Sequence, residues 1–104
     1  MQRVRNAARA STVACALLAT SGCGGVLYAV QASGTDAKLQ EAKELGAEER
    51  APYEYFYARE HMNKAMEEAA QGDYSDAIDL ANIAEEYADK AVKLAREAHR
   101  GAGR

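Results

Sequence analysis

The 104-residue sequence lacks tryptophan and has only one phenylalanine, one proline and two cysteines. Its hydrophobic fraction is 48%, but alanine supplies much of that share and large apolar side chains are few. β-Branched and aromatic residues favour strands, whereas alanine, glutamate and lysine favour helices. The composition therefore disfavours a β-rich fold and predicts long helices. The length is enough for one small domain and too short for two.

Acidic residues are missing from the first third of the chain, where none precedes Asp36. Three of the thirteen basic residues lie within the first nine positions. If the chain is cleaved after Gly22, ten basic residues remain against sixteen acidic ones, and the net charge moves from −3 to −6. Because like charges repel, an acidic domain is a poor ligand for nucleic acid or an anionic lipid surface. We expect no nucleic-acid partner.

Residues that could carry chemistry are also scarce. His61 and His99 are far apart in sequence and belong to no metal-binding motif, so each is expected to be an exposed helical histidine. Adjacent glutamates point in different directions on a helix and are expected to form solvated faces, as at Glu48-Glu49, Glu67-Glu68 and Glu85-Glu86. The sequence therefore predicts no enzyme, no cofactor, no metal site and no small-molecule substrate.

The N-terminus is typical of a bacterial lipoprotein signal peptide. A basic region (Arg3, Arg5 and Arg9) precedes a short apolar segment, Ala10–Ala19, and then Thr20-Ser21-Gly22-Cys23. The small residues before the cysteine fit the lipoprotein peptidase, although Thr20 stands where leucine is usual. The interpretation is a signal peptide at 1–22, a lipidated N-terminus at 23–26 and acylation of Cys23, which attaches the protein to the membrane.

Two alternatives to this anchor stay open. Roughly 20 residues without charge could span a bilayer as an uncleaved helix, although three glycines around Cys23 interrupt that stretch. A plain secreted protein is the other alternative.

Cleavage would remove Cys15 and leave a mature chain without a disulfide. The residue after the cysteine is Gly24, whereas lipoproteins retained in the inner membrane often have aspartate at this position. This favours an outer-membrane lipoprotein facing the periplasm, with the inner membrane as the other possibility.

Three helices are predicted after the anchor, at about 27–45, 52–71 and 74–98, with 100–104 as a disordered tail. The first has a weak point near Gly34, and two possibilities stay open there: the helix begins near Val26 and continues, or it restarts after Gly34 with Thr35 as its N-cap. Gly46 and Gly72 are expected to end the first and second helices, and Pro52 suits the first position of the second helix. Short connections force neighbouring helices to be antiparallel, so the fold class is all-α, an up-down-up three-helix bundle.

Two apolar seams define the expected core. In the second helix the residues recur at spacings of 3 and 4, as Tyr55, Ala58, Met62, Ala65 and Ala69. In the third helix a stripe of alanines has the same spacing, as Ala77, Ala81, Ala84, Ala88, Ala91 and Ala95. Larger residues beside the stripe are expected to supply bulk. Salt pairs are expected for Glu86–Lys90 and Asp89–Lys93.

Four aromatic residues crowd the start of the second helix: Tyr53, Tyr55, Phe56 and Tyr57. They spread around the helix, so they cannot all enter one core. One interpretation is that Tyr55 and Phe56 cap the bundle while Tyr53 and Tyr57 lie on the surface or against the first helix. The other is that Tyr53 and Tyr57 form a patch that binds a partner, since tyrosine offers a large contact area at low entropy cost.

The motifs Gly46-Ala47, Ala51-Pro52, Glu54-Tyr55 and Gly72-Asp73-Tyr74, with alanines at their expected spacing, resemble the DUF4398 family. This resemblance covers residues 27–99 and implies a small helical domain of envelope lipoproteins without an established activity. Residues 72–78 also look like the turn and second helix of one tetratricopeptide repeat, but the first half of that repeat is not satisfied and no repetition occurs.

The expected function is a non-enzymatic, membrane-tethered helical adaptor in the cell envelope, which binds another envelope protein or a second copy of itself. The alternative is a structural envelope lipoprotein that contacts peptidoglycan or another glycan, with its tyrosines stacked on sugars. The partner and the oligomeric state stay open at this point.

Overall fold

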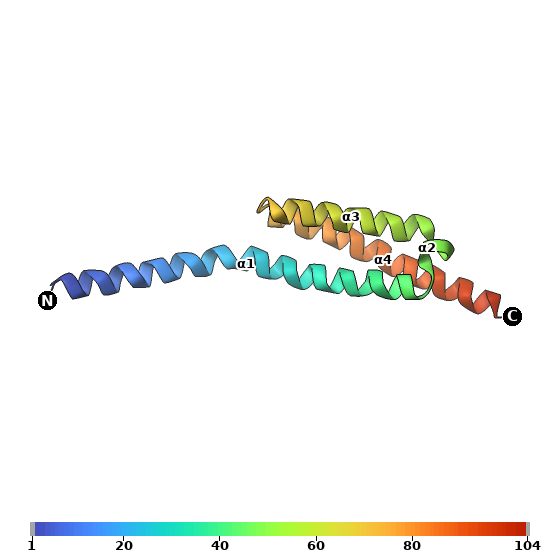
Figure 1. Cartoon of the computed structure of the whole chain (residues 1–104), viewed down its shortest axis with the longest axis horizontal. Coiled ribbons are helices and arrows are strands. Elements are labelled where there is room, and N and C mark those ends of the chain that lie inside the picture. The colour runs from blue at the N-terminus through green and yellow to red at the C-terminus, as the bar shows by residue number, and fades with distance from the viewer. Residues whose placement is uncertain (1, 104) are drawn as a thin grey trace.

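A computed structural model describes the backbone of residues 2–103 and the side chains of residues 23–103. Its helices are α1 (Gln2–Glu44), α2 (Ala47–Arg50), α3 (Pro52–Ala70) and α4 (Tyr74–Ala102), and residues 2–103 contain no strand. The predicted all-α, up-down-up arrangement is confirmed, as Figure 1 shows. The signal-peptide interpretation of 1–22 concerns side chains outside the described residues, so it stays a prediction.

α4 is the central helix of the bundle. It packs along both α1 and α3, whereas α1 and α3 contact each other much less, and Figure 1 shows α4 between them. Near its start α4 contacts α1 through Tyr28–Tyr74, and further along both helices it contacts α1 through Glu41–Arg96. The residue numbers increase together, so these two helices run in the same direction. α3 runs antiparallel to both.

The core is built mainly from alanine, as the spacing predicted. All six alanines of the α4 stripe have zero exposure, and Ala58 and Ala65 of α3 are equally buried. Methyl groups occupy little space at a helix contact, so the helix axes can approach closely. Bulk comes from Tyr55 and Met62, which are 4% and 2% exposed. Ala69, at the end of the predicted seam, is half-buried.

The larger residues beside the alanine stripe contribute unequally to the core. Val92 is buried as expected, at 3% exposure. Ile83 and Leu94 are 37% and 39% exposed and lie at the rim of the bundle. The α4 helix therefore buries a narrow stripe of methyl groups and leaves much of its aliphatic volume near the surface.

Of the two possibilities left open for the first helix, the restart with Thr35 as its N-cap is wrong. α1 continues without interruption through Gly34, and Thr35 lies inside it with zero exposure. Its hydroxyl oxygen lies 3.0 Å from the carbonyl oxygen of Gln31 and 3.2 Å from that of Ala81 on α4. A threonine facing another helix can satisfy its hydroxyl without breaking its own helix. α1 also begins well before residue 27, at Gln2.

The connections differ in detail from the predicted loops. The segment between the first two predicted helices contains the short helix α2 (Ala47–Arg50). Its first residue, Ala47, and the residue after it, Ala51, are buried at 0% and 3% exposure. Gly46 and Gly72 have φ of 75° and 82°, the left-handed conformation that glycine adopts without strain. The predicted helix ends at both glycines are therefore confirmed.

At its C-terminus α4 continues to Ala102, so the predicted disordered tail at 100–104 is wrong for residues 100–102. His99 and Arg100 lie in the last turn. Positive charge there stabilises the negative end of the helix dipole. Among residues 23–103, no helical segment combines the length and apolarity needed to cross a membrane.

Ion pairs form within α4 and also between α4 and α1. Lys90 pairs with Glu86 at 2.8 Å, as predicted from their spacing. Asp89, however, pairs with Lys38 of α1 at 3.1 Å, so the expected partner within its own helix, Lys93, is replaced by a residue of another helix. This hydrogen bond and the Asp89 charge raise the pKa of Lys38 above its usual value. Exposed pairs of this kind add little to stability.

Candidate interaction surface

Three tyrosines from two helices gather on one side of the bundle. Tyr53 and Tyr57 lie one helical turn apart on α3, with ring centroids 5.7 Å apart. Tyr87 of α4 lies 4.2 Å from Tyr57 and 6.4 Å from Tyr53, measured between ring centroids. We call Tyr53, Tyr57 and Tyr87 the tyrosine cluster. The structure thus brings together the two tyrosines that the sequence singled out and adds a third.

The tyrosine cluster lies at the seam between α3 and α4, on the side away from α1. α4 faces α1 through Glu85, Asp89 and Arg96, whose partners are residues of α1. Tyr87 is two residues from both Glu85 and Asp89, which places it about 200° around the helix from either one. The predicted surface position is confirmed for Tyr53, which is 64% exposed, whereas the predicted contact with the first helix is wrong, since the cluster packs against α4.

The members of the cluster differ in exposure. Tyr53 is 64% exposed, whereas Tyr57 and Tyr87 are half-buried against each other. Tyr87 contributes its ring to the base of the cluster, and Tyr53 projects furthest into solvent. This arrangement fixes two rings by mutual contact and leaves a third accessible, so the exposed aromatic area is largely pre-organised.

His61 extends the cluster by one turn of α3. Its ring stacks on Tyr57 with centroids 4.1 Å apart, and its Nδ1 lies 2.9 Å from the carbonyl oxygen of Tyr57. Because a carbonyl oxygen can only accept, Nδ1 donates the proton of this hydrogen bond. The prediction of an exposed histidine is therefore wrong. His61 is half-buried and supports the Tyr57 ring.

A positive charge lies at the edge of the cluster. The Lys90 ammonium is 4.4 Å from the centroid of the Tyr87 ring, within the range of a cation–π contact. Its hydrogen bond to Glu86 raises the pKa of Lys90, and the charges of Glu86 and Glu54 add to that effect. The cluster therefore combines exposed aromatic area with one fixed cation.

The other two aromatics of the same segment have separate positions. Tyr55 is buried, as predicted, and contacts the core formed with Ala91, Val92 and Ala95. Phe56 is 40% exposed and lies under the Arg59 guanidinium at 5.3 Å, so it does not cap the core. The segment 53–57 thus divides its four aromatics between the core, the tyrosine cluster and a separate surface position.

Sequence reasoning missed Tyr87 as a member of the cluster, although a signal was present. Tyr57 and Tyr87 are each fifteen residues from Gly72, the glycine at the hairpin turn. In an antiparallel hairpin, residues equidistant from the turn lie opposite each other. Both tyrosines also flank buried alanines, Ala58 and Ala88.

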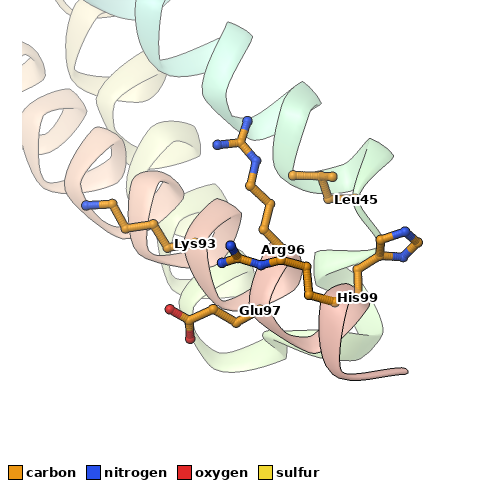
Figure 2. A pocket seen from close by; sticks show the side chains of 6 residues that line it. Leu45, Lys93, Arg96, Glu97 and His99 are labelled. Carbon is orange, nitrogen blue, oxygen red and sulfur yellow. The ribbon is translucent and has the colours of Figure 1, made fainter. Parts of the chain in front are cut away.

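A second feature is an open hollow at the opposite end of the bundle from Cys23. It has a volume of about 350 Å³ and is lined by Leu45, directly after the end of α1, and by residues of the last turns of α4, namely Lys93, Arg96, Glu97, His99 and Arg100. In Figure 2 the α4 side chains spread in different directions, and Lys93 and Glu97 point away from Leu45. Arg96 already pairs with Glu41. The hollow is shallow and of mixed charge.

Among the residues with described side chains, no group of three or more metal-binding side chains converges on one point. Cys23 is exposed and lies in α1 at the start of the packed bundle, next to Gly24, which contacts Tyr74.

The family described as "Domain of unknown function (DUF4398)" matches residues 30–102. The chain belongs to the DUF4398 family. The match ends at the last residue of α4 and covers α2, α3 and α1 from Val30 onward, whereas Gly24 and Tyr28, which also pack on α4, lie before it. The expected span of 27–99 is shifted by three residues at each end. No curated protein and no solved structure matches the chain.

Proposed function

We propose that this DUF4398 protein is a non-enzymatic adaptor of the bacterial cell envelope, attached to the outer membrane through lipid on Cys23 and facing the periplasm. Its bundle binds another envelope protein, or a second copy of itself, through the tyrosine cluster. The observation that carries the proposal is the exposed ring of Tyr53 above the Tyr57–Tyr87 pair.

Aromatic anchors of this type suit a binding surface. Tyrosine buries a large area on association, has few rotatable bonds to immobilise and offers a hydroxyl for a hydrogen bond at the rim. The Lys90 cation beside Tyr87 adds a charge that can favour one partner orientation over another. A small domain with an alanine core also gains stability from a partner that binds only its folded state.

The position of the cluster is consistent with a lipid anchor at Cys23. Gly24 contacts Tyr74 at the start of α4, and Tyr87 lies thirteen residues further along the same helix. At 1.5 Å per residue this is about 20 Å. With α4 directed away from the membrane, a partner bound at the tyrosine cluster would sit clear of the membrane surface.

Co-purification tests the adaptor function. The full-length protein and its Tyr53→Ala variant are crosslinked in cells, and the solubilised membrane proteins and the isolated cell-wall sacculi are recovered separately. We expect Tyr53→Ala to reduce a crosslinked envelope protein or dimer at least tenfold. Met66→Ala is the matched control, because Met66 is 48% exposed on the same helix and is not part of the cluster.

The same experiment separates the adaptor from the glycan alternative, in which the tyrosines stack on sugars. Retention on sacculi that is lost in Tyr53→Ala, without any protein partner, would favour glycan contact. If Tyr53→Ala and Met66→Ala both leave every crosslink unchanged, the tyrosine cluster is not a binding surface and the adaptor proposal fails.

A further inference from the structure

The outer face of α1 carries an exposed apolar stripe beside Cys23. Val26, Leu27 and Val30 are 63%, 63% and 70% exposed. Together with Cys23 they occupy positions i, i+3, i+4 and i+7 of one helix, so all four side chains lie on the same face. We call Val26, Leu27 and Val30 the aliphatic stripe. It lies on α1, whereas the tyrosine cluster lies on the side of the bundle away from α1.

The start of this stripe is held firmly against the bundle. The ring of Tyr74 lies across the backbone of Gly24 and Gly25, where an added Cβ would lie 3.2 Å and 3.5 Å from the nearest Tyr74 atoms. Tyr74 also contacts Tyr28, with ring centroids 6.3 Å apart, and burial raises the pKa of the Tyr28 phenol. No flexible linker therefore separates Cys23 from the packed domain, since contact begins at the next residue.

Charge is absent from α1 over the same interval. Between Cys23 and Thr35 the sequence has no charged residue, and the charged positions of α1 within the bundle begin with Asp36. From Cys23 to Val30 the helix rises about 10 Å. An apolar helix face enters the headgroup region to a depth of about 5–10 Å, and burying this uncharged interval there desolvates no charged side chain.

We infer that the aliphatic stripe rests in the lipid surface, so that the first two turns of α1 after Cys23 form a second membrane contact beside the acyl chains. This inference rests on the proposed lipid anchor at Cys23. The chemical class of the ligand is the headgroup and upper acyl region of a phospholipid bilayer. Because Gly24 is packed against Tyr74, this contact fixes the orientation of the whole bundle on the membrane.

Single tryptophan reporters test the inference, because the chain contains no tryptophan of its own. Leu27→Trp places a reporter in the stripe, and Val30→Trp is a second reporter that guards against misfolding of the first. Ala37→Trp is the control, at an exposed position of α1 beyond the uncharged interval. Each full-length variant is produced in a bacterium with two membranes, purified from the membrane fraction and reconstituted into phosphatidylethanolamine–phosphatidylglycerol vesicles containing lipids brominated near the headgroup.

We expect brominated lipid to reduce the emission of Leu27→Trp and Val30→Trp at least twofold and to leave Ala37→Trp unchanged. Mass spectrometry of the same samples determines whether the N-terminus carries lipid. Acylated protein whose stripe reporters are not quenched overturns this inference alone, and a blue-shifted but unquenched emission would mean that protein, such as a second copy, covers the stripe. Equal quenching of all three reporters would also overturn the inference, because the membrane contact would then extend along α1 instead of being confined to the two turns after Cys23. An N-terminus without lipid overturns both the proposed anchor and this inference.

Discussion

The hydroxyl of Thr35 shares one proton between two helices. It lies 3.0 Å from the carbonyl oxygen of Gln31, one turn earlier in α1, and 3.2 Å from that of Ala81 in α4. Thr35 is also the largest side chain with zero exposure in the described part of the bundle. An interface lined mostly by methyl groups thus contains one buried hydroxyl that links α1 to α4 and favours a single register between them.

Thr35→Val is expected to destabilise the bundle by about 1 kcal/mol. Valine keeps the shape of threonine and removes the shared hydrogen bond, whose net contribution is of this order. Urea unfolding followed by circular dichroism measures the change. Ser33→Ala, at an exposed position of the same helix, is the control and should leave the midpoint unchanged. An equally stable Thr35→Val protein would show that the hydroxyl contributes nothing to the α1–α4 contact.

Ala84→Leu is expected to cost roughly 1–3 kcal/mol by overpacking. Ala84 has zero exposure and shares a core cluster with Met62, Ala65 and Ala81. Three additional carbons cannot enter this contact unless α3 or α1 moves away. The melting temperature reports the effect. Asn82→Leu, at an exposed position of α4, is the matched control. A melting temperature that rises in Ala84→Leu would contradict the close helix contact.

Two glycines should respond to alanine in opposite directions. Gly34 lies inside α1, and a Cβ there would meet only a side-chain oxygen of Glu85 at 3.9 Å. Gly34→Ala should therefore stabilise the protein by about 0.5–1 kcal/mol through helix propensity. Gly72 has open space but a φ of 82°. Gly72→Ala should destabilise by about 1 kcal/mol because alanine is strained in the left-handed region. Thermal unfolding of both variants checks the two signs.

Alanine variants of the tyrosines of α3 should form a graded series of stability losses. Tyr55→Ala removes a side chain that is 4% exposed and should cost about 3 kcal/mol or more. Tyr57→Ala loses the stacking with Tyr87 and His61 and should cost about 1–2 kcal/mol. Tyr53→Ala, at 64% exposure, should stay within about 1 kcal/mol of the wild-type protein.

Equilibrium urea unfolding of these three variants measures the order of their stability losses. The same variants also separate an effect on folding from an effect on binding. Tyr53 is expected to matter for association far more than for stability. If Tyr53→Ala were as destabilising as Tyr55→Ala, and association were unaffected, Tyr53 would be a core residue and the binding role of the tyrosine cluster would be wrong.

Cys23→Ser is expected to abolish incorporation of radiolabelled palmitate and to leave an unprocessed precursor. The thiol is the atom that accepts the lipid, and serine offers no equivalent nucleophile to the lipid transferase. Electrophoresis after metabolic labelling shows both effects. Cys15→Ser is the control, because Cys15 lies in the segment that cleavage would remove. Normal cleavage and release of Cys23→Ser would contradict the lipoprotein interpretation.

Local patterns in the sequence predict the three long helices, their antiparallel order and the buried face of α4. A hydrophobic repeat of 3 and 4 residues is a local property, so the alanine stripe from Ala77 to Ala95 could be read directly, and all six members proved fully buried. Gly46 and Gly72 could be placed for the same reason, since a left-handed residue after a helix is recognisable from glycine alone. Short turns then required antiparallel neighbours.

The tertiary structure alone decided which side chains meet across helices. A sequence shows Asp89 four residues from Lys93, but only packing reveals that Lys38 of α1 lies closer. Threonine is a residue type that often caps helices, but Thr35 lies inside α1 and contacts α4, where the carbonyl oxygen of Ala81 accepts a hydrogen bond from its hydroxyl. Tyr57 and Tyr87 are thirty residues apart and are joined by the hairpin register. Such contacts depend on which helix faces meet and on the register between the helices. Local patterns identify the apolar face of each helix, but they do not show which polar side chains of neighbouring helices come within reach of each other.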